Sequence, residues 1–291
     1  MSGNSDELVR AYLDRYCIEY RMLETRQATT ECTIFGKKLA TPIMLGGLAH
    51  YHKLQPGGAP EYAKAALAAN TAMWTGFCGD EELEKIISVG APAARIFKPF
   101  ADREIVLRAI QHDKAAGACA IAMDIDHAYN KEGMYDEFFG KPLAPQTRES
   151  LSEYVQSSDL PFFVKGILSV RDAVMCAEAG VAGIVISQHQ NMFPWAIPPV
   201  KVLPEIRREV GSRMTILVDS ALRDGYDVFK ALAWGADSVF IVRPMMPIFR
   251  EQGWEGVYKR LEVMTDELRI CLSRTGSRDI HQIDAGVIRQ L

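Results

Sequence analysis

Four chemically versatile side chains stand at or just beyond the ends of short apolar runs in this sequence. They are Asp126, Lys165, His189 and Asp219. A histidine close to a carboxylate can act as a general base, because the carboxylate fixes the imidazole tautomer and raises its basicity. A lysine that ends an apolar run needs an anionic or electron-rich partner to offset its burial. These residue types therefore predict an acid–base site with a fixed positive charge.

Short apolar runs alternate with longer segments of helical period from about residue 42 onward. Continuous apolar runs are typical of strands buried on both faces of a parallel sheet, and the 291 residues suffice for one barrel of about 250 residues. We therefore predict an α/β fold, a single (β/α)8 TIM barrel, whose active site lies at the carboxyl ends of the strands. The eight predicted strands are 42–45, 72–75, 94–97, 121–125, 162–165, 183–187, 216–219 and 239–241.

The remaining segments complete the predicted domain organisation. We expect residues 1–41 to form an N-terminal helical extension, residues 42–275 the barrel, and residues 276–291 a C-terminal tail. A polar segment over 127–146, which contains two glycines and two prolines, interrupts the regular strand and helix alternation. Loops of this length are usually lids or binding loops.

Composition excludes several classes of function. The chain has 33 Lys and Arg against 37 Asp and Glu, a net charge of -4, which argues against nucleic acid as a partner. The N-terminus lacks a signal-peptide pattern and no apolar stretch approaches about 20 residues, so we expect a cytoplasmic protein without membrane spans. The six cysteines are scattered, and His50 and His52 give only a weak metal signal without further ligands nearby. We expect no metal, and His127 could line the mouth of the barrel without reacting.

A phosphate site is expected after the seventh and eighth strands. Many TIM barrels bind phosphate there, at backbone N–H groups and a helix N-terminus. Arg223 and Arg243 could hold one phosphate between them. Alternatively, one of the two arginines pairs with Asp219 or Asp224.

Several stretches of the sequence resemble the FMN-dependent α-hydroxy acid oxidases and dehydrogenases. The similarity is collinear from about residue 20 to about residue 275, so it covers the whole predicted barrel. The stretches that carry it are 163–168, 177–189, 227–237 and 239–244.

The resemblance implies FMN as the cofactor and gives roles to the residues at the strand ends. Lys165 matches the lysine that faces flavin N1 and O2, His189 the catalytic base, and Asp126 the aspartate that hydrogen-bonds this base. Asp219 matches the start of the phosphate turn. The candidate cofactor-binding residues are Lys165, Ser187, Asp219, Arg223, Arg243, Gly46 and Gly47.

The departures from the family affect mainly the substrate side of the site. Met192 stands where the family has the arginine that binds the substrate carboxylate, and an active-site tyrosine is replaced within 95–97. Asp124 replaces a threonine. Arg95 or Lys131 could supply a replacement cation, but a changed substrate is the interpretation we favour. An apolar pocket is expected from Met192, Phe193, Trp195 and Phe97, although 193–195 could equally be a core or interface patch.

We therefore predict an FMN-dependent oxidoreductase that oxidises a small molecule by base-assisted hydride transfer to flavin N5. The carbon that loses hydride would bear a hydroxyl or an amine, and the substrate would not be a simple lactate-like 2-hydroxy acid. One alternative is an FMN barrel isomerase with no net redox change, and another is a catalytically silent barrel. We expect a homo-oligomer, because tetramers are common in the family.

Overall fold

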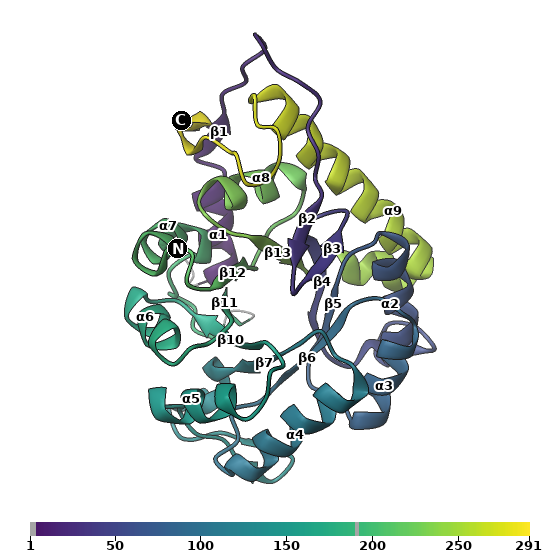
Figure 1. Cartoon of the computed structure of the whole chain (residues 1–291), viewed down its shortest axis with the longest axis vertical. Coiled ribbons are helices and arrows are strands. Elements are labelled where there is room, and N and C mark those ends of the chain that lie inside the picture. Colours follow the sequence, from purple (N-terminus) through teal and green to yellow (C-terminus); the bar gives the residue numbers. More distant parts are fainter. Residues whose placement is uncertain (1–3, 190–191) are drawn as a thin grey trace.

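The computed structural model describes residues 4–189 and 192–291, and within them eight parallel strands close into a barrel surrounded by helices (Figure 1). Each strand overlaps one of the predicted apolar runs, so the TIM-barrel prediction is confirmed. The barrel closes where Val239 pairs with Ile43. Its strands are β4 (Ile43–Leu48), β5 (Met73–Thr75), β6 (Ala93–Phe97), β7 (Ala120–Asp124), β10 (Phe162–Ile167), β11 (Gly183–Ile186), β12 (Thr215–Val218) and β13 (Ser238–Ile241).

Helices form the outer ring of Figure 1 and bury their apolar faces against the strands. Gly180 and Gly235 follow α6 and α8 with φ of 81° and 110°, a left-handed conformation that glycine adopts without steric cost. The last helix is broken at Gly253, which has a non-helical backbone. The helices are α2 (Gly58–Ala68), α3 (Asp80–Ser88), α4 (Arg103–Ala116), α5 (Arg148–Gln156), α6 (Val170–Glu178), α7 (Pro199–Val210), α8 (Gly225–Ala233) and α9 (Met245–Arg274).

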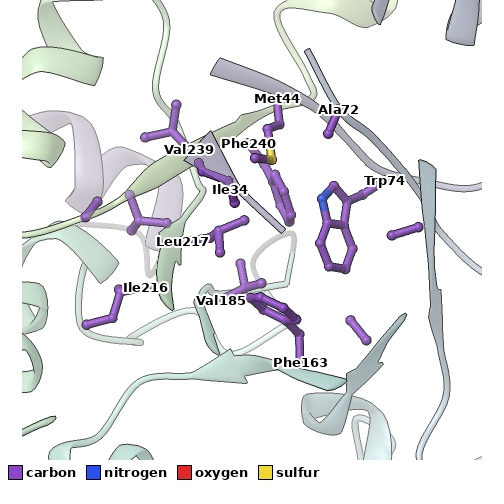
Figure 2. Packing of buried hydrophobic residues seen from close by; sticks show 14 of the residues in the cluster. Ile34, Met44, Ala72, Trp74, Phe163, Val185, Ile216, Leu217, Val239 and Phe240 are labelled. Atoms are coloured by element: carbon purple, nitrogen blue, oxygen red, sulfur yellow. The ribbon is translucent and has the colours of Figure 1, made fainter. Parts of the chain in front are cut away.

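Large aromatic side chains fill the interior of the barrel (Figure 2). The ring of Trp74 packs against Phe163 and against Phe240, with centroid distances of 5.4 Å in both cases. Phe35, from a hairpin outside the barrel, packs edge-on against Trp74 and Phe163. The hairpin and these rings therefore fill the amino-terminal end of the barrel interior.

The N-terminal extension, residues 1–41, combines one helix with short strands. Its helix α1 (Ser5–Leu13) lies beside α8, where Lys230 Nζ donates a hydrogen bond to the Leu13 carbonyl at 3.0 Å. The rest of the extension finds strand partners, which override its helical pattern. These strands are β1 (Tyr16–Ile18), paired with β14 (Ile288–Gln290) near the C-terminus, and the hairpin of β2 (Cys32–Ile34) and β3 (Lys37–Leu39).

The predicted loop over 127–146 follows a short 3-10 helix η2 (Ile125–Ala128) and contains the hairpin of β8 (Glu137–Phe138) and β9 (Lys141–Pro142). Phe138 packs against Phe77, with 4.6 Å between the ring centroids, so the hairpin lies over the loop that follows β5. The other 3-10 helices are η1 (Tyr51–Lys53) and η3 (Ala285–Val287). Among the described residues, no helix is both long and apolar enough to cross a bilayer.

Candidate active site

A cavity of about 480 Å³ opens at the carboxyl ends of the strands, which we call the mouth of the barrel. Parallel strands end on the same side of a barrel, so residues far apart in sequence meet here. Of the predicted site residues, those that line this cavity are Gly47, Lys165, Ser187, His189, Asp219, Arg223 and Arg243. Gly46 does not line it. A Cβ at Gly46 would lie 2.4 Å from the Trp74 carbonyl oxygen, so close packing between strands requires glycine there.

Asp124 is the electrostatic centre of the mouth. It ends β7, is 3% exposed, and accepts hydrogen bonds from Lys165 Nζ at 3.2 Å and Lys98 Nζ at 3.1 Å. His189 Nδ1 lies 3.1 Å from Asp124 Oδ2. Burial alone would raise the pKa of Asp124, but the Lys165 ammonium, with His189 and Lys98, holds this pKa well below its usual range. Asp124 is therefore a carboxylate at neutral pH.

Asp126, predicted to hydrogen-bond His189, is farther from the imidazole than Asp124. Its Oδ1 lies 3.7 Å from His189 Nδ1 and has no hydrogen-bond partner among the described residues. A distance of 3.7 Å is too long for a hydrogen bond, so the predicted contact is replaced by the one from Asp124. The sequence signal for Asp124 is a charged residue inside the apolar run 121–125, two positions before Asp126.

The raised pKa of Asp126 makes the free energy of unfolding depend on pH. Burial and the neighbouring Asp124 charge raise the pKa of Asp126 to about 7, against about 3.9 in an unfolded chain. Between these values the folded state holds a proton that the unfolded state releases, so this contribution to stability is lost as pH rises through about 7. We expect Asp126→Asn to flatten the pH dependence of the free energy of unfolding between about pH 4 and pH 7.

Urea unfolding at several pH values would measure this effect. Glu132→Gln, an exposed substitution in the same loop, serves as the control and should keep the wild-type pH dependence. An unchanged pH dependence in the Asp126 variant would show that this carboxyl titrates normally.

Two histidines face each other beside the carboxylates. The Nε2 atoms of His127 and His189 are 3.2 Å apart, and their rings meet edge to face. Burial, together with the positive charge of Lys98, lowers the pKa of His127 to about 3, so this ring is neutral. Asp124 Oδ2, 3.1 Å from Nδ1 of His189, favours the tautomer with the proton on Nδ1. The lone pair is then on Nε2, where His127 can donate to it.

The same side chains form the cluster that comes closest to a metal site. Ligand atoms of Asp124, Asp126, His127 and His189 all lie within 4.8 Å of one another. The ammonium groups of Lys98 and Lys165 already bind both oxygens of Asp124, which leaves little negative charge for a cation. The cluster fits an acid–base network better than a metal centre.

The turn after β12, where a phosphate site was expected, has an unusual backbone conformation. Ser220 and Ala221 follow β12 with φ of 79° and 56°, a conformation that costs non-glycine residues about 1–2 kcal/mol each. The Ser220 hydroxyl helps to hold the turn, because it donates to the Gln188 carbonyl at 3.3 Å or to Asp219 Oδ1 at 2.8 Å. Successive N–H groups in such a turn form an anion-binding concavity. The backbone at 220–221 thus adopts this conformation although neither residue is a glycine.

Arg243 is held by a carboxylate from the N-terminal extension. Both of its terminal nitrogens bond the carboxylate of Asp6 in α1, and Gln188 Nε2 lies 3.4 Å from Asp6 Oδ1. Asp6 thus occupies the position that a phosphate would take against Arg243. The exposed Arg223 lines the same end of the cavity. No motif signalled Asp6, because it reaches the barrel from a distant part of the chain.

Removal of the Asp6 charge should strengthen FMN binding. Asp6→Asn frees Arg243 for the phosphate, and a partly exposed ion pair is worth up to about 1 kcal/mol, so we expect about a two- to fivefold lower Kd. Fluorescence titration of the apoprotein with FMN measures the change. Riboflavin, which lacks the phosphate, should bind both forms equally. Asp159→Asn removes an exposed carboxylate that pairs with Lys114 away from this cavity, and it should change neither Kd. Equal gains for FMN and riboflavin would contradict this explanation.

Unpaired polar atoms between the two ends of the cavity point to a bound group. Ser187 Oγ and Gln188 Oε1 are buried without a hydrogen-bond partner among the described residues, and buried polar atoms in proteins are rarely left unpaired. They lie between Lys165, which is 4% exposed, and the phosphate turn. A cation at one end, an anion-binding turn at the other and free polar atoms between them fit FMN.

A second cavity, of about 240 Å³, adjoins the first, and Gly47, Lys165 and His189 line both. Ile96 of β6 and Lys98, the residue after β6, both line it. Side chains alternate along a strand, so Arg95 and Phe97 point the other way. Further lining residues are Leu48, Ala49, His50, Phe77, Asp124, His127 and Phe138.

The residues considered from sequence for an apolar pocket or a replacement cation do not line the smaller cavity. Arg95 is paired with Asp113 and Asp80, and Phe97 packs against Phe162 outside the barrel. The side chains of Phe193 and Trp195 are 70% and 59% exposed, and Lys131 is exposed in the loop. Met192, Phe193 and Trp195 line neither cavity. Phe77 and Phe138 supply the aromatic surface instead.

The barrel and the residues at its mouth define a flavin-dependent oxidoreductase. The chain belongs to the FMN-dependent dehydrogenase family, whose model matches residues 3–138 and 128–290. FMN is accordingly its cofactor, and the predicted membership of the α-hydroxy acid oxidase group is confirmed. Nothing supports the isomerase or the silent barrel.

Individual relatives match most of the chain at moderate sequence identity. Glycolate oxidase of Spinacia oleracea is 30% identical over 288 residues, which cover 86% of this chain and 78% of that protein. The 4-hydroxymandelate oxidase of Amycolatopsis orientalis is 28% identical over 316 residues, covering 96% of this chain and 88% of the relative. A mandelate oxidase variant solved with (S)-mandelic acid superposes with a TM-score of 0.89 at 29% identity, over 100% of this chain and 90% of the other.

Proposed function

We propose that this oxidoreductase uses His189 as the base that removes a proton from a hydroxyl or amine of a small substrate. The observation that carries the proposal is the 3.1 Å contact between His189 Nδ1 and Asp124 Oδ2. A carboxylate at this atom holds the proton on Nδ1 and leaves Nε2 free to accept another. Because Nε2 is within 3.2 Å of His127 Nε2, the substrate must displace His127 from this hydrogen bond.

The cofactor site would extend along the larger cavity. Lys165, Ser187 and the backbone at Gly47 would contact the ring end, and Asp219, the turn at 220–221, Arg223 and Arg243 would surround the phosphate. FMN supplies the ring that accepts hydride from the substrate carbon. Burial opposes the charge on Lys165, but Asp124 and Asp219 raise the pKa of Lys165 above its usual value, so the ammonium is permanent. A fixed positive charge there stabilises negative charge that arrives during the reaction.

The substrate would occupy the smaller cavity. Phe77, Phe138 and Ile96 give it apolar walls, and His189 and Lys98 give it polar contacts. Such a pocket suits a small molecule with an apolar or aromatic body better than lactate. The names of the relatives with aromatic substrates, 4-hydroxymandelate oxidase and mandelate oxidase, support the same choice.

The test is anaerobic mixing of the purified, FMN-loaded enzyme with candidate substrates. Lasting bleaching of the visible flavin absorbance by small hydroxy or amino compounds with an aromatic body would support the proposal. Bleaching by lactate or glycolate, but not by any aromatic candidate, would contradict the substrate assignment. Turnover without bleaching would instead indicate isomerisation.

The location and assembly of the protein are part of the same proposal. All six cysteines are free thiols, which suits a reducing compartment, and we propose a cytoplasmic homo-oligomer made of three segments, 1–41, 42–275 and 276–291. No nucleic acid or membrane partner is proposed. Light scattering during size-exclusion chromatography would measure the mass of the assembly, and a mass equal to that of the 32.4 kDa chain would contradict it.

A further inference from the structure

Lys98 is a buried cation for which no sequence motif predicts a role. It follows directly after β6 and is 9% exposed. Its Nζ donates to Asp124 Oδ2 at 3.1 Å, and the side chain lines the smaller cavity. An ammonium has three N–H donors, and the bond to Asp124 uses one of them.

The charge around the smaller cavity favours an anion. Of the described residues that line it, Lys98 and Lys165 are positive and Asp124 alone is negative. Burial and the positive charge of Lys98 lower the pKa of His127 to about 3, so His127 adds no charge. Asp219, just outside this cavity, lies 4.0 Å from Lys165 Nζ and offsets its charge. An anion in the cavity would therefore be bound through the remaining N–H donors of Lys98.

The other cations considered from sequence cannot take this role. Arg95 is bound to Asp113 and Asp80 on the outer side of β6, and Lys131 is exposed in the loop. Met192, at the position of the family's arginine, carries no charge. Lys98 therefore combines three properties: it is buried, it lines the smaller cavity, and it has donors left after its bond to Asp124.

We propose that Lys98 selects the substrate by binding a carboxylate, in place of the arginine that this chain lacks. The proposal rests on the function proposed above and adds the substrate class, a small carboxylate with an apolar or aromatic body. Asp124 holds the ammonium in place, while Phe77 and Phe138 contact the body of the substrate. Lys98 is thus a specificity-determining residue that needs no part in the proton transfer.

Binding of two matched probes tests the proposal independently of catalysis. Benzoylformate and its uncharged amide differ only in the carboxylate, and calorimetric titration of the FMN-loaded protein gives a Kd for each. We expect the wild type to bind benzoylformate at least about tenfold more tightly than the amide, as is typical of a charge-assisted hydrogen bond. Lys98→Met should lose this preference by weakening only the carboxylate, and Lys98→Arg should restore part of it.

Controls separate this role from a structural one. Lys131→Met removes an exposed lysine and should leave both Kd values unchanged, and His189→Gln should still prefer the carboxylate, because binding does not need the base. Equal weakening of both probes in Lys98→Met would show that Lys98 only supports Asp124. Wild-type protein that binds neither probe, or both equally, would also overturn the proposal. Failure of His189→Gln to lose activity would contradict the proposed function but not this one.

Discussion

Replacement of His189 by glutamine is expected to abolish substrate-driven reduction of the flavin while leaving FMN bound. Glutamine retains polar atoms near Asp124 but cannot accept a proton, and loss of a general base typically costs about a hundred- to ten-thousandfold in rate. Anaerobic stopped-flow absorbance with a substrate found in the screen measures the rate of reduction. The visible absorbance and FMN titration show whether the cofactor site is intact.

A second histidine serves as the control for this variant. His281→Gln lies on the surface near the C-terminus and should reduce at the wild-type rate. Wild-type reduction kinetics in His189→Gln would remove the base from the proposed mechanism.

Replacement of Asp124 by asparagine is expected to reduce both stability and activity. Lys98 and Lys165 would lose the carboxylate that binds both of them, and loss of one partner from a buried ion pair typically costs about 3–5 kcal/mol. The imidazole of His189 would also lose the group that fixes its tautomer. We expect a lower free energy of unfolding in urea and at least about a hundredfold slower flavin reduction.

The matched comparison is Asp126→Asn, since the two aspartates are close in sequence and in space. Asp126 has no ion pair with a lysine and holds its proton up to a pKa of about 7, so asparagine replaces it at little cost in stability. A double variant, Asp124→Asn with Lys98→Met, should recover part of the stability because one unpaired ammonium is gone. Slower reduction in the Asp126 variant than in the Asp124 variant would restore the orienting role predicted from sequence.

The barrel itself was predictable because its signals are local. Continuous apolar runs mark strands covered on both faces, and glycines such as Gly180 and Gly235 mark helix ends. The order of the elements then determines which strand ends share the mouth. Lys165 and His189 both line the cavity for this reason, since each ends or follows an apolar run.

The errors of prediction concern side-chain direction and distant contacts. A shift of one residue along β6 exchanges the faces of a strand. Phe97 was therefore expected in the pocket, and Arg95 was considered as a cation there, whereas Ile96 and Lys98 line it. The contact between Asp6 and Arg243 joins residues 237 positions apart, and no local pattern predicts it.

The crystal structure of the FMN-loaded protein is the measurement that tests the central claim most directly. We predict the ring edge within hydrogen-bonding distance of Lys165 Nζ, the phosphate on the N–H groups of the turn at 220–221, and Arg243 turned from Asp6 to the phosphate. His189 should lie over the ring, on the side of the smaller cavity. FMN bound elsewhere, or a cavity between Lys165 and Arg243 that holds only water, would contradict the assignment of this site.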